Sequence, residues 1–237
     1  SAIQRRLTHL VVLTTLLAFG VWLRVSNYGQ VFAFGSVLPL TADAAYHLHR
    51  SLQVFASFPH APVFDRLMNW PVGAYSHVAD GYDLVSAALA RLLVSTENEL
   101  GAATVMVYVP VLFGLATAWF ARVLCARLTE PERWPLTEFM TLAAALLLPI
   151  GLFVSLLGRT DHHCAEALCV CLLCSWLCQR FPLATSDART FRFELLGALC
   201  ITLAMYMFNG SPVYIGLCLP VLVVAITFDR EPRTRWL

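Results

Sequence analysis

The stretch LTEFMTLAAALLLPIGLFVSLLGRTDHHCAEALCVCLLCSWLCQRF, residues 136–181, consists of two apolar runs separated by one short polar turn. A helix that crosses the hydrocarbon of a bilayer needs about 20 mostly apolar residues. The runs at about 136–157 and 164–181 approach that length. The stretch therefore predicts two membrane-spanning helices joined by a turn at 158–163.

The rest of the chain has the same apolar character. Of its 237 residues, 59% are hydrophobic and 13% are charged, whereas soluble domains carry roughly 25% charged residues. Further apolar runs lie at about 7–25, 102–124, 195–208 and 213–228. We expect an all-α fold, a polytopic bundle of about six transmembrane helices with a long first outer loop at about 26–83. The net charge of +1 says nothing about nucleic acid, but the chain has no basic block, and we expect no nucleic-acid partner.

The arginines predict the orientation of this bundle. All sixteen basic residues are arginines, and with the N-terminus in the cytoplasm eleven of them fall on the inner side and five on the outer side. Cytoplasmic loops of membrane proteins carry such an excess of positive charge. We therefore expect 26–83 and 158–163 both to face outside. We also expect the chain to be an integral protein of a prokaryotic inner or plasma membrane.

Carboxylates and imidazoles gather on this outer side. Asp43 lies four residues before His47, and Asp161 is followed directly by His162 and His163. A carboxylate beside a bilayer is costly unless it is paired or bound to a metal. Oxygen ligands favour magnesium or manganese, and added imidazole shifts the preference towards manganese or zinc. The two aspartates, 118 positions apart, therefore predict a shared site for a divalent cation.

A structural role for Asp161 is the alternative to a metal site. Its carboxylate could pair with Arg159 or cap the helix that begins near Cys164. His162 and Glu166 are four residues apart, so they could form a hydrogen bond along one helical face. The sequence leaves both interpretations open.

Two more outer segments carry polar or aromatic residues. Trp70 and Tyr75 of the first outer loop suit the interfacial aromatic belt of a membrane protein, or stacking on a sugar. Asn209-Gly210 is a turn pair between the last two runs. It is either a plain turn or part of the same outer cavity.

Together and in this order, the motifs resemble the catalytic subunit of oligosaccharyltransferases. The aspartate and aromatic-His-x-x-Arg element of that family's first outer loop is matched by Asp43, Tyr46, His47 and Arg50. Its Asp…Asn-aromatic-Pro-x-Gly continuation is matched by Asp65, Asn69, Trp70, Pro71 and Gly73. Its second outer loop is matched by Gly158, Asp161 and His163. Its turn before a later span is echoed by Phe208, Asn209, Gly210 and Pro212.

The resemblance implies a GT-C glycosyltransferase that moves a glycan from a polyprenyl-phosphate-linked oligosaccharide to the asparagine of an acceptor polypeptide. It implies Asp43 and Asp161 as catalytic residues, with Asp43, Asp161 and His163 as ligands of Mn²⁺ or Mg²⁺. The substrate-binding residues that it implies are Tyr46, His47, Arg50, Arg159 and Asn209. It also implies that membrane lipid surrounds the bundle.

The resemblance further implies a domain organisation. Residues 1–237 correspond to the N-terminal part of a transmembrane catalytic domain, and the acceptor-reading C-terminal domain of the family has no counterpart among them. Two other functions remain open at this point. One is a GT-C enzyme that glycosylates a lipid or a hydroxyl acceptor, and the other is a membrane protein that binds or transports metal without catalysis.

Overall fold

The computed structural model describes residues 2–76, 79–128, 134–180 and 187–228. The long helices are α1 (Ala2–Arg24), α6 (Val109–Leu128), α7 (Trp134–Leu147), α9 (His163–Arg180), α10 (Asp187–Met207) and α11 (Ser211–Phe228). The shorter elements are α2 (Tyr28–Val31), α3 (Ala42–Ser57), β1 (Phe64–Asp65), β2 (Ala74–Tyr75), α4 (Gly81–Leu93), α5 (Glu99–Met106) and α8 (Pro149–Val154). The described residues are thus mostly helical, and the predicted all-α class is confirmed at that level.

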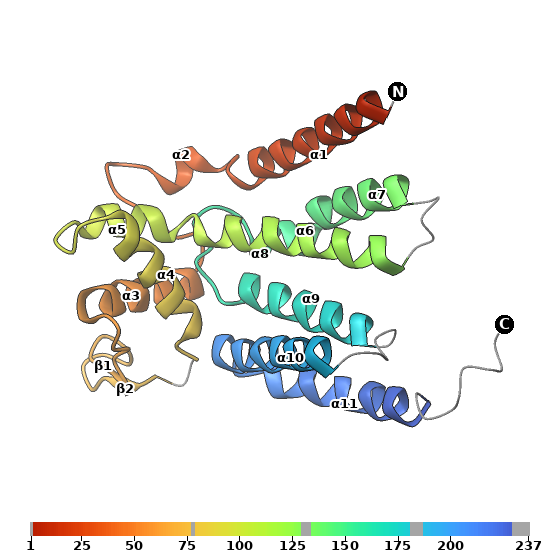
Figure 1. Ribbon diagram of the computed structural model, residues 1–237. Coiled ribbons are helices and arrows are strands. Elements are labelled where there is room, and N and C mark those ends of the chain that lie inside the picture. Colours follow the sequence, from red (N-terminus) through yellow and green to blue (C-terminus); the bar gives the residue numbers. More distant parts are fainter. Residues whose placement is uncertain (1, 77–78, 129–133, 181–186, 229–237) are drawn as a thin grey trace.

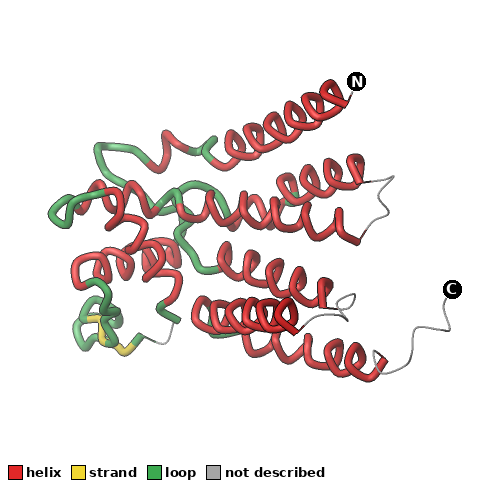
Figure 2. The backbone as a smooth tube through the Cα atoms, viewed as in Figure 1, coloured by secondary structure: helices red, strands yellow, loops and turns green. Residues whose placement is uncertain are grey.

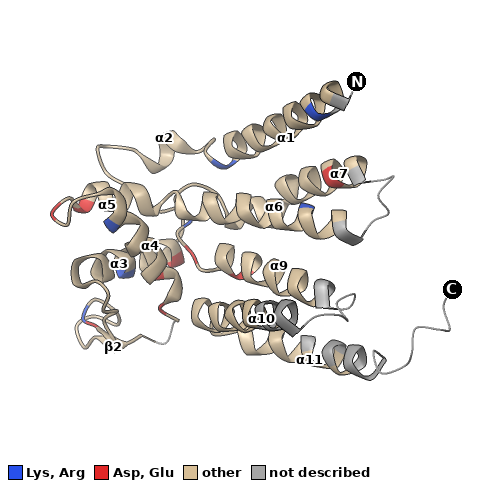
Figure 3. Cartoon of the chain, viewed as in Figure 1, with Lys and Arg blue, Asp and Glu red and all other residues tan. Residues whose placement is uncertain are grey.

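The long helices run side by side, and helix α6 lies near the middle of the row (Figure 1). It packs against α7 and α9, and α9 packs in turn against α10. Leu13 of α1, Ala118 of α6 and Leu142 and Leu146 of α7 form one buried apolar cluster. Most of the length of these helices carries no charge (Figure 3).

Two described segments are long and apolar enough to cross a membrane, Arg6–Val31 and Glu99–Ala126. The apolar helices Pro135–Leu147, His163–Leu177 and Leu195–Met207 are shorter. The single run expected at 136–157 is divided into α7 and α8, because Pro149 opens α8 and the residue before a proline is disfavoured in a helix. Six membrane spans therefore stay a prediction.

The expected long outer loop contains secondary structure of its own (Figure 2). Thr41 caps α3, since its hydroxyl accepts a hydrogen bond from the Ala44 N–H at 3.2 Å. Strands β1 and β2 pair antiparallel with Phe64 opposite Tyr75. His49 Nε2 of α3 lies 3.2 Å from the Asp65 carboxylate of β1, so the hairpin lies against the helix.

Helices α2 to α5 and the β-hairpin gather at one end of the long helices, and the segment between α8 and α9 reaches the same end (Figure 1). The N-terminus lies at the opposite end. The two segments predicted to share a side therefore do lie together. Their orientation relative to a membrane stays a prediction.

Candidate metal centre

The segment that carries Asp161 is held by backbone hydrogen bonds to three distant parts of the chain. The Leu157 N–H donates to the carbonyl of Arg24 at 2.8 Å, and the Gly158 N–H donates to that of Val107 at 3.1 Å. The Leu40 N–H donates to the Gly158 carbonyl at 3.1 Å. The segment is therefore fixed between the end of α1, the α5–α6 junction and the approach to α3.

Arg24 reinforces this arrangement from a buried position at the end of α1. Its Nε donates to Ser155 Oγ at 2.9 Å, and its Nη1 donates to the carbonyls of Gly20 and Leu146 at 3.2 and 3.3 Å. These bonds join α1 to α7 and to the start of the loop that carries Asp161.

Thr160 connects this loop to α3. Its hydroxyl donates a buried hydrogen bond of 2.6 Å to the Ala44 carbonyl. Because Asp43 and Asp161 each neighbour one of these two residues, the bond brings the two predicted catalytic segments together. Asp43 itself is exposed in the first turn of α3.

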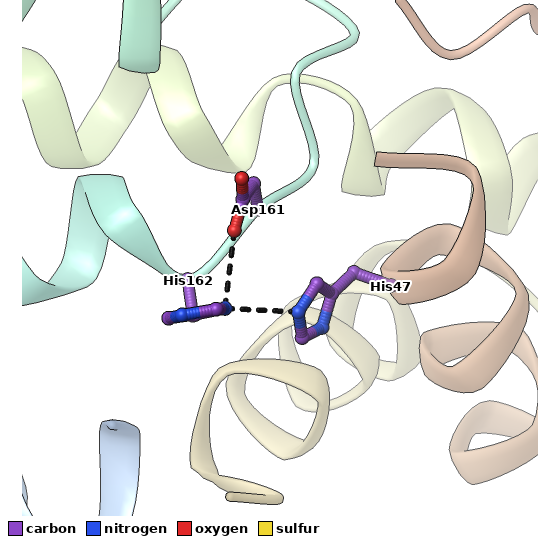
Figure 4. A group of neighbouring side chains, drawn as sticks. All are labelled: His47, Asp161 and His162. Carbon is purple, nitrogen blue, oxygen red and sulfur yellow. Dashed lines mark hydrogen bonds and ion pairs between the residues drawn. The ribbon is translucent and has the colours of Figure 1, made fainter. Parts of the chain in front are cut away.

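The groups that meet most closely are His47, Asp161 and His162 (Figure 4). His162 Nδ1 lies 2.9 Å from His47 Nε2 and 3.1 Å from Asp161 Oδ1. One potential ligand atom from each of the three residues lies within 4.8 Å of the other two. His47 and Asp161 are almost fully buried, at 2% and 1% exposure. The chain thus brings two imidazoles and a carboxylate to one point.

The environment of Asp161 favours its charged form. Burial raises the pKa of a carboxyl, but the contact with His162 and the charges that His163, His162 and His47 carry when they are protonated outweigh burial and lower the pKa of Asp161 to about 2. Among the described residues, neither of its buried carboxylate oxygens has a hydrogen-bond partner of good geometry. Within that part of the chain it neither pairs with Arg159 nor caps α9, so both structural alternatives lose their basis.

His47 also belongs to a second buried hydrogen-bond network, which is centred on Asp83. The Asp83 carboxylate of α4 accepts from His47 Nδ1 at 3.0 Å, from Ser51 Oγ at 3.1 Å and from Arg50 Nε at 3.0 Å. Arg50 also pairs with Asp80. Burial alone would lower the pKa of Arg50, but its hydrogen bond and charge interaction with Asp83 outweigh burial and raise it.

His163 occupies the outer side of the cluster. Its Nε2 lies 4.0 Å from Asp161 Oδ2, and its side chain is 45% exposed. Its Nδ1 bonds to Glu166 at 2.9 Å, and Tyr214 of α11 donates to the other oxygen of Glu166. The spacing allowed a bond between His162 and Glu166, but Glu166 bonds to His163 instead.

The remaining predicted residues make other contacts or are exposed. The Tyr46 hydroxyl lies 3.2 Å from Ser76 Oγ. The Arg159 guanidinium rests over Phe153 at 3.8 Å, and within the described part of the chain its Nε and Nη1 have no hydrogen-bond partner. Asn209 is exposed between α10 and α11.

Sequence reasoning missed Asp83 and gave His162 no metal role. Asp83 opens an apolar run, and an acidic residue at that boundary is typical of an ordinary helix start. Its three partners are His47, Arg50 and Ser51. Their spacing places them on one face of α3, because residues three or four positions apart are neighbours on a helix. Only the packing of α3 against α4 reveals that this face meets Asp83.

The donor set fits a divalent cation. Asp161 offers carboxylate oxygens that lack donors, and His47 and His162 offer imidazole nitrogens beside them. Mixed nitrogen and oxygen ligands suit manganese or zinc better than magnesium, which prefers oxygen alone. The buried aspartate and its imidazoles therefore support a metal centre.

Comparison with known proteins confirms the resemblance seen in the motifs. No protein-family model matches the chain. The chain is 24% identical over 214 residues to the dolichyl-phosphooligosaccharide-protein glycotransferase 2 of Archaeoglobus fulgidus, a match that covers 90% of the chain and 32% of that protein.

Solved structures of an Archaeoglobus fulgidus oligosaccharyltransferase share the fold. The complex with zinc and sulfate superposes with a TM-score of 0.79 at 19% identity and covers 88% of the chain and 26% of that protein. The form tethered to an acceptor peptide with the NVT sequon gives 0.77 at 21% identity and covers 93% and 26%. The chain thus spans about a third of the curated relative's length and about a quarter of the solved structure's.

Proposed function

We propose that this chain, which resembles the catalytic subunit of the oligosaccharyltransferases, is the N-terminal membrane portion of a glycosyltransferase of that type. It would transfer a glycan from a polyprenyl-phosphate-linked donor to the asparagine of an acceptor polypeptide. The observation that carries the proposal is the buried Asp161 carboxylate, which lies within 4.8 Å of the imidazoles of His47 and His162. These two histidines are 115 positions apart in the sequence, so the cluster exists only where α3 meets the loop between α8 and α9.

A bound divalent cation would stabilise the negative charge that develops on the leaving phosphate of the donor. Asp161, with His162 and either His47 or His163, would hold it, and Asp43 is the further ligand that the family resemblance predicts. Mn²⁺ fits this mixed donor set better than Mg²⁺. The chain's own part in the reaction is to place these ligands at a site that its buried residues shield from water.

Arg159 is proposed to bind the donor phosphate. Its guanidinium belongs to a residue two positions before Asp161, and its Nε and Nη1 lack hydrogen-bond partners among the described residues. An arginine fork matches the geometry of phosphate oxygens. The other residues proposed to contact substrate are Tyr46, His47, Arg50 and Asn209, of which the first three belong to α3.

The proposed setting is a prokaryotic plasma membrane with the site facing outside. The predicted excess of arginine on the other side of the bundle supports that orientation. The two segments able to cross a membrane by length and composition support membrane insertion.

The test uses the full-length protein in detergent, with a polyprenyl-linked oligosaccharide and two peptides that differ only by asparagine or glutamine at the acceptor position. We expect Mn²⁺-dependent transfer to the asparagine peptide alone. Asp161→Asn should abolish transfer and weaken Mn²⁺ binding, and Asp43→Asn should do the same. Transfer that persists in chelator, or in Asp161→Asn, would contradict the proposal.

A further inference from the structure

We propose that Asp83 is a positioning residue that fixes the ring of His47, so that His47 Nε2 presents its lone pair to the metal centre. This inference rests on the proposed function, because it concerns the same site. Of the two alternative ligands, His47 and His163, it selects His47, and it assigns a task to a residue of α4 that the motifs do not include.

The tautomer of His47 follows from its two contacts. A carboxylate can only accept, so the Nδ1 that lies 3.0 Å from Asp83 Oδ1 carries the proton. In the neutral ring the other nitrogen, Nε2, then has a free lone pair. That atom lies 2.9 Å from His162 Nδ1, on the side of Asp161 (Figure 4).

The buried charge of Asp83 is balanced without using His47 as a cation. Arg50 Nε lies 3.0 Å from Asp83 Oδ2, and both side chains are at most 1% exposed. A buried carboxylate needs such a partner, since an unpaired buried charge is strongly destabilising. With Arg50 in that role, His47 can remain a neutral donor towards Asp83 and an acceptor towards the site.

In the metal-free centre, the proton on His162 Nδ1 lies where a bound cation would fit. His162 Nδ1 faces both His47 Nε2 and Asp161 Oδ1, at 2.9 and 3.1 Å. That N–H donates to His47 Nε2, and among the described residues the nearby Asp161 Oδ1 has no hydrogen-bond donor of good geometry. A divalent cation bound there would meet the lone pair of His47 and the carboxylate of Asp161. Histidine ligands of metals usually donate their other N–H to a carboxylate, and loss of that partner weakens metal binding about 10–100-fold.

The chain provides a matched control in Asp80. Asp80 and Asp83 both pair with Arg50, but only Asp83 contacts His47. If Asp83 served only to neutralise Arg50, the two aspartates would have similar effects on metal binding. If it positions His47, only Asp83 should matter, and only while His47 is present.

The experiment measures the Mn²⁺ affinity of the full-length protein as wild type, as Asp80→Asn, Asp83→Asn and His47→Ala, and with each aspartate variant combined with His47→Ala. We expect Asp83→Asn to weaken binding about 10–100-fold, Asp80→Asn to leave it nearly unchanged, and Asp83→Asn to add nothing once His47 is alanine. Equal effects of the two aspartates, or an undiminished effect of Asp83→Asn without His47, would overturn the inference.

A second measurement needs neither metal nor activity. In metal-free protein labelled with ¹⁵N-histidine, His47 should show a protonated Nδ1 and an unprotonated Nε2, and Asp83→Asn should introduce the opposite tautomer. A wild-type His47 protonated at Nε2 would overturn the inference. Failure of the wild type to bind Mn²⁺, with the expected tautomer intact, would count against the proposed function instead. Thermal unfolding of each variant checks that the fold persists.

Discussion

Asp161 combines burial with retained charge. Its carboxyl is 1% exposed, yet neighbouring histidines hold its pKa at about 2, below the ordinary value of 3.8. A buried carboxylate that stays ionised is a group poised to bind a cation, because its charge is already in place.

The low pKa of Asp161 makes stability depend on pH. Because the folded-state pKa is lower than the unfolded one, the contribution is complete above about pH 4 and is lost as the pH falls through about 2. A pKa shift of this size corresponds to ~2 kcal/mol in the free energy of unfolding. ¹³C NMR of the Asp161 carboxyl should show titration near pH 2. His162→Gln should raise this pKa, because it removes a positive neighbour. An unchanged titration in that variant would refute the role given to His162.

Gly158 is the residue that lets the loop before α9 turn. Its φ is +78°, and a Cβ there would lie 2.7 Å from Val31 Cγ2. Gly158→Ala should therefore lower the free energy of unfolding by about 1–3 kcal/mol and weaken Mn²⁺ binding. Gly216→Ala is the control, since nothing lies within 4 Å of its added Cβ. Equal thermal stability of the two variants would contradict this explanation.

At the scale of elements, the site depends on how α3 meets the loop before α9. Helix α3 turns one face, with His47, Arg50 and Ser51, towards Asp83 of α4. The hydroxyl of Thr160 then ties the loop to the first turn of the same helix. Helix α3 therefore sets the position of both halves of the centre.

Thr160→Val tests this link between the loop and α3. The variant removes the hydroxyl and leaves the buried Ala44 carbonyl without its 2.6 Å partner, which costs about 1–3 kcal/mol. We expect a lower melting temperature and weaker Mn²⁺ binding. Thr160→Ser keeps the hydroxyl and should restore most of both. If Thr160→Ser behaved like Thr160→Val, the hydrogen bond would not be the cause.

At the scale of the whole molecule, the chain separates a polar end from a row of apolar helices. Helices α2 to α5, the hairpin and the loop before α9 lie at one end, and the N-terminus lies at the other (Figure 1). In a membrane oriented as the arginines predict, this separation would place the site at the outer surface, where the proposed lipid-linked donor and the proposed acceptor could both reach it.

Cysteine labelling tests the orientation. Leu67→Cys and Ile3→Cys place thiols at exposed positions near opposite ends. In intact cells we expect a membrane-impermeant maleimide to label Leu67→Cys, and to label Ile3→Cys only after permeabilisation. The unaltered chain, with its eight cysteines, is the control. Labelling of both positions from outside would contradict the predicted orientation.

The sequence by itself determined the helical class, the division into apolar runs and polar segments, and the pairing of the α3 segment with the Asp161 loop. The class and the division follow from hydropathy, which can be read residue by residue along the chain. The pairing follows from the two apolar runs that separate the segments, because two membrane crossings return the chain to the same side. Sequence reasoning did not identify Pro149 as the point where one helix ends and another begins, although proline carries that signal.

Only the tertiary structure decided which side chains meet. Spacing allowed a contact between His162 and Glu166, but in the structure Glu166 bonds to His163, and His162 bonds to His47. Asp43 stays exposed, whereas His47, one helical turn later, lies in the cluster. Asp83 contacts His47 because α4 packs on α3. Such contacts depend on the packing of helices distant in sequence, and no local pattern of residues contains that information.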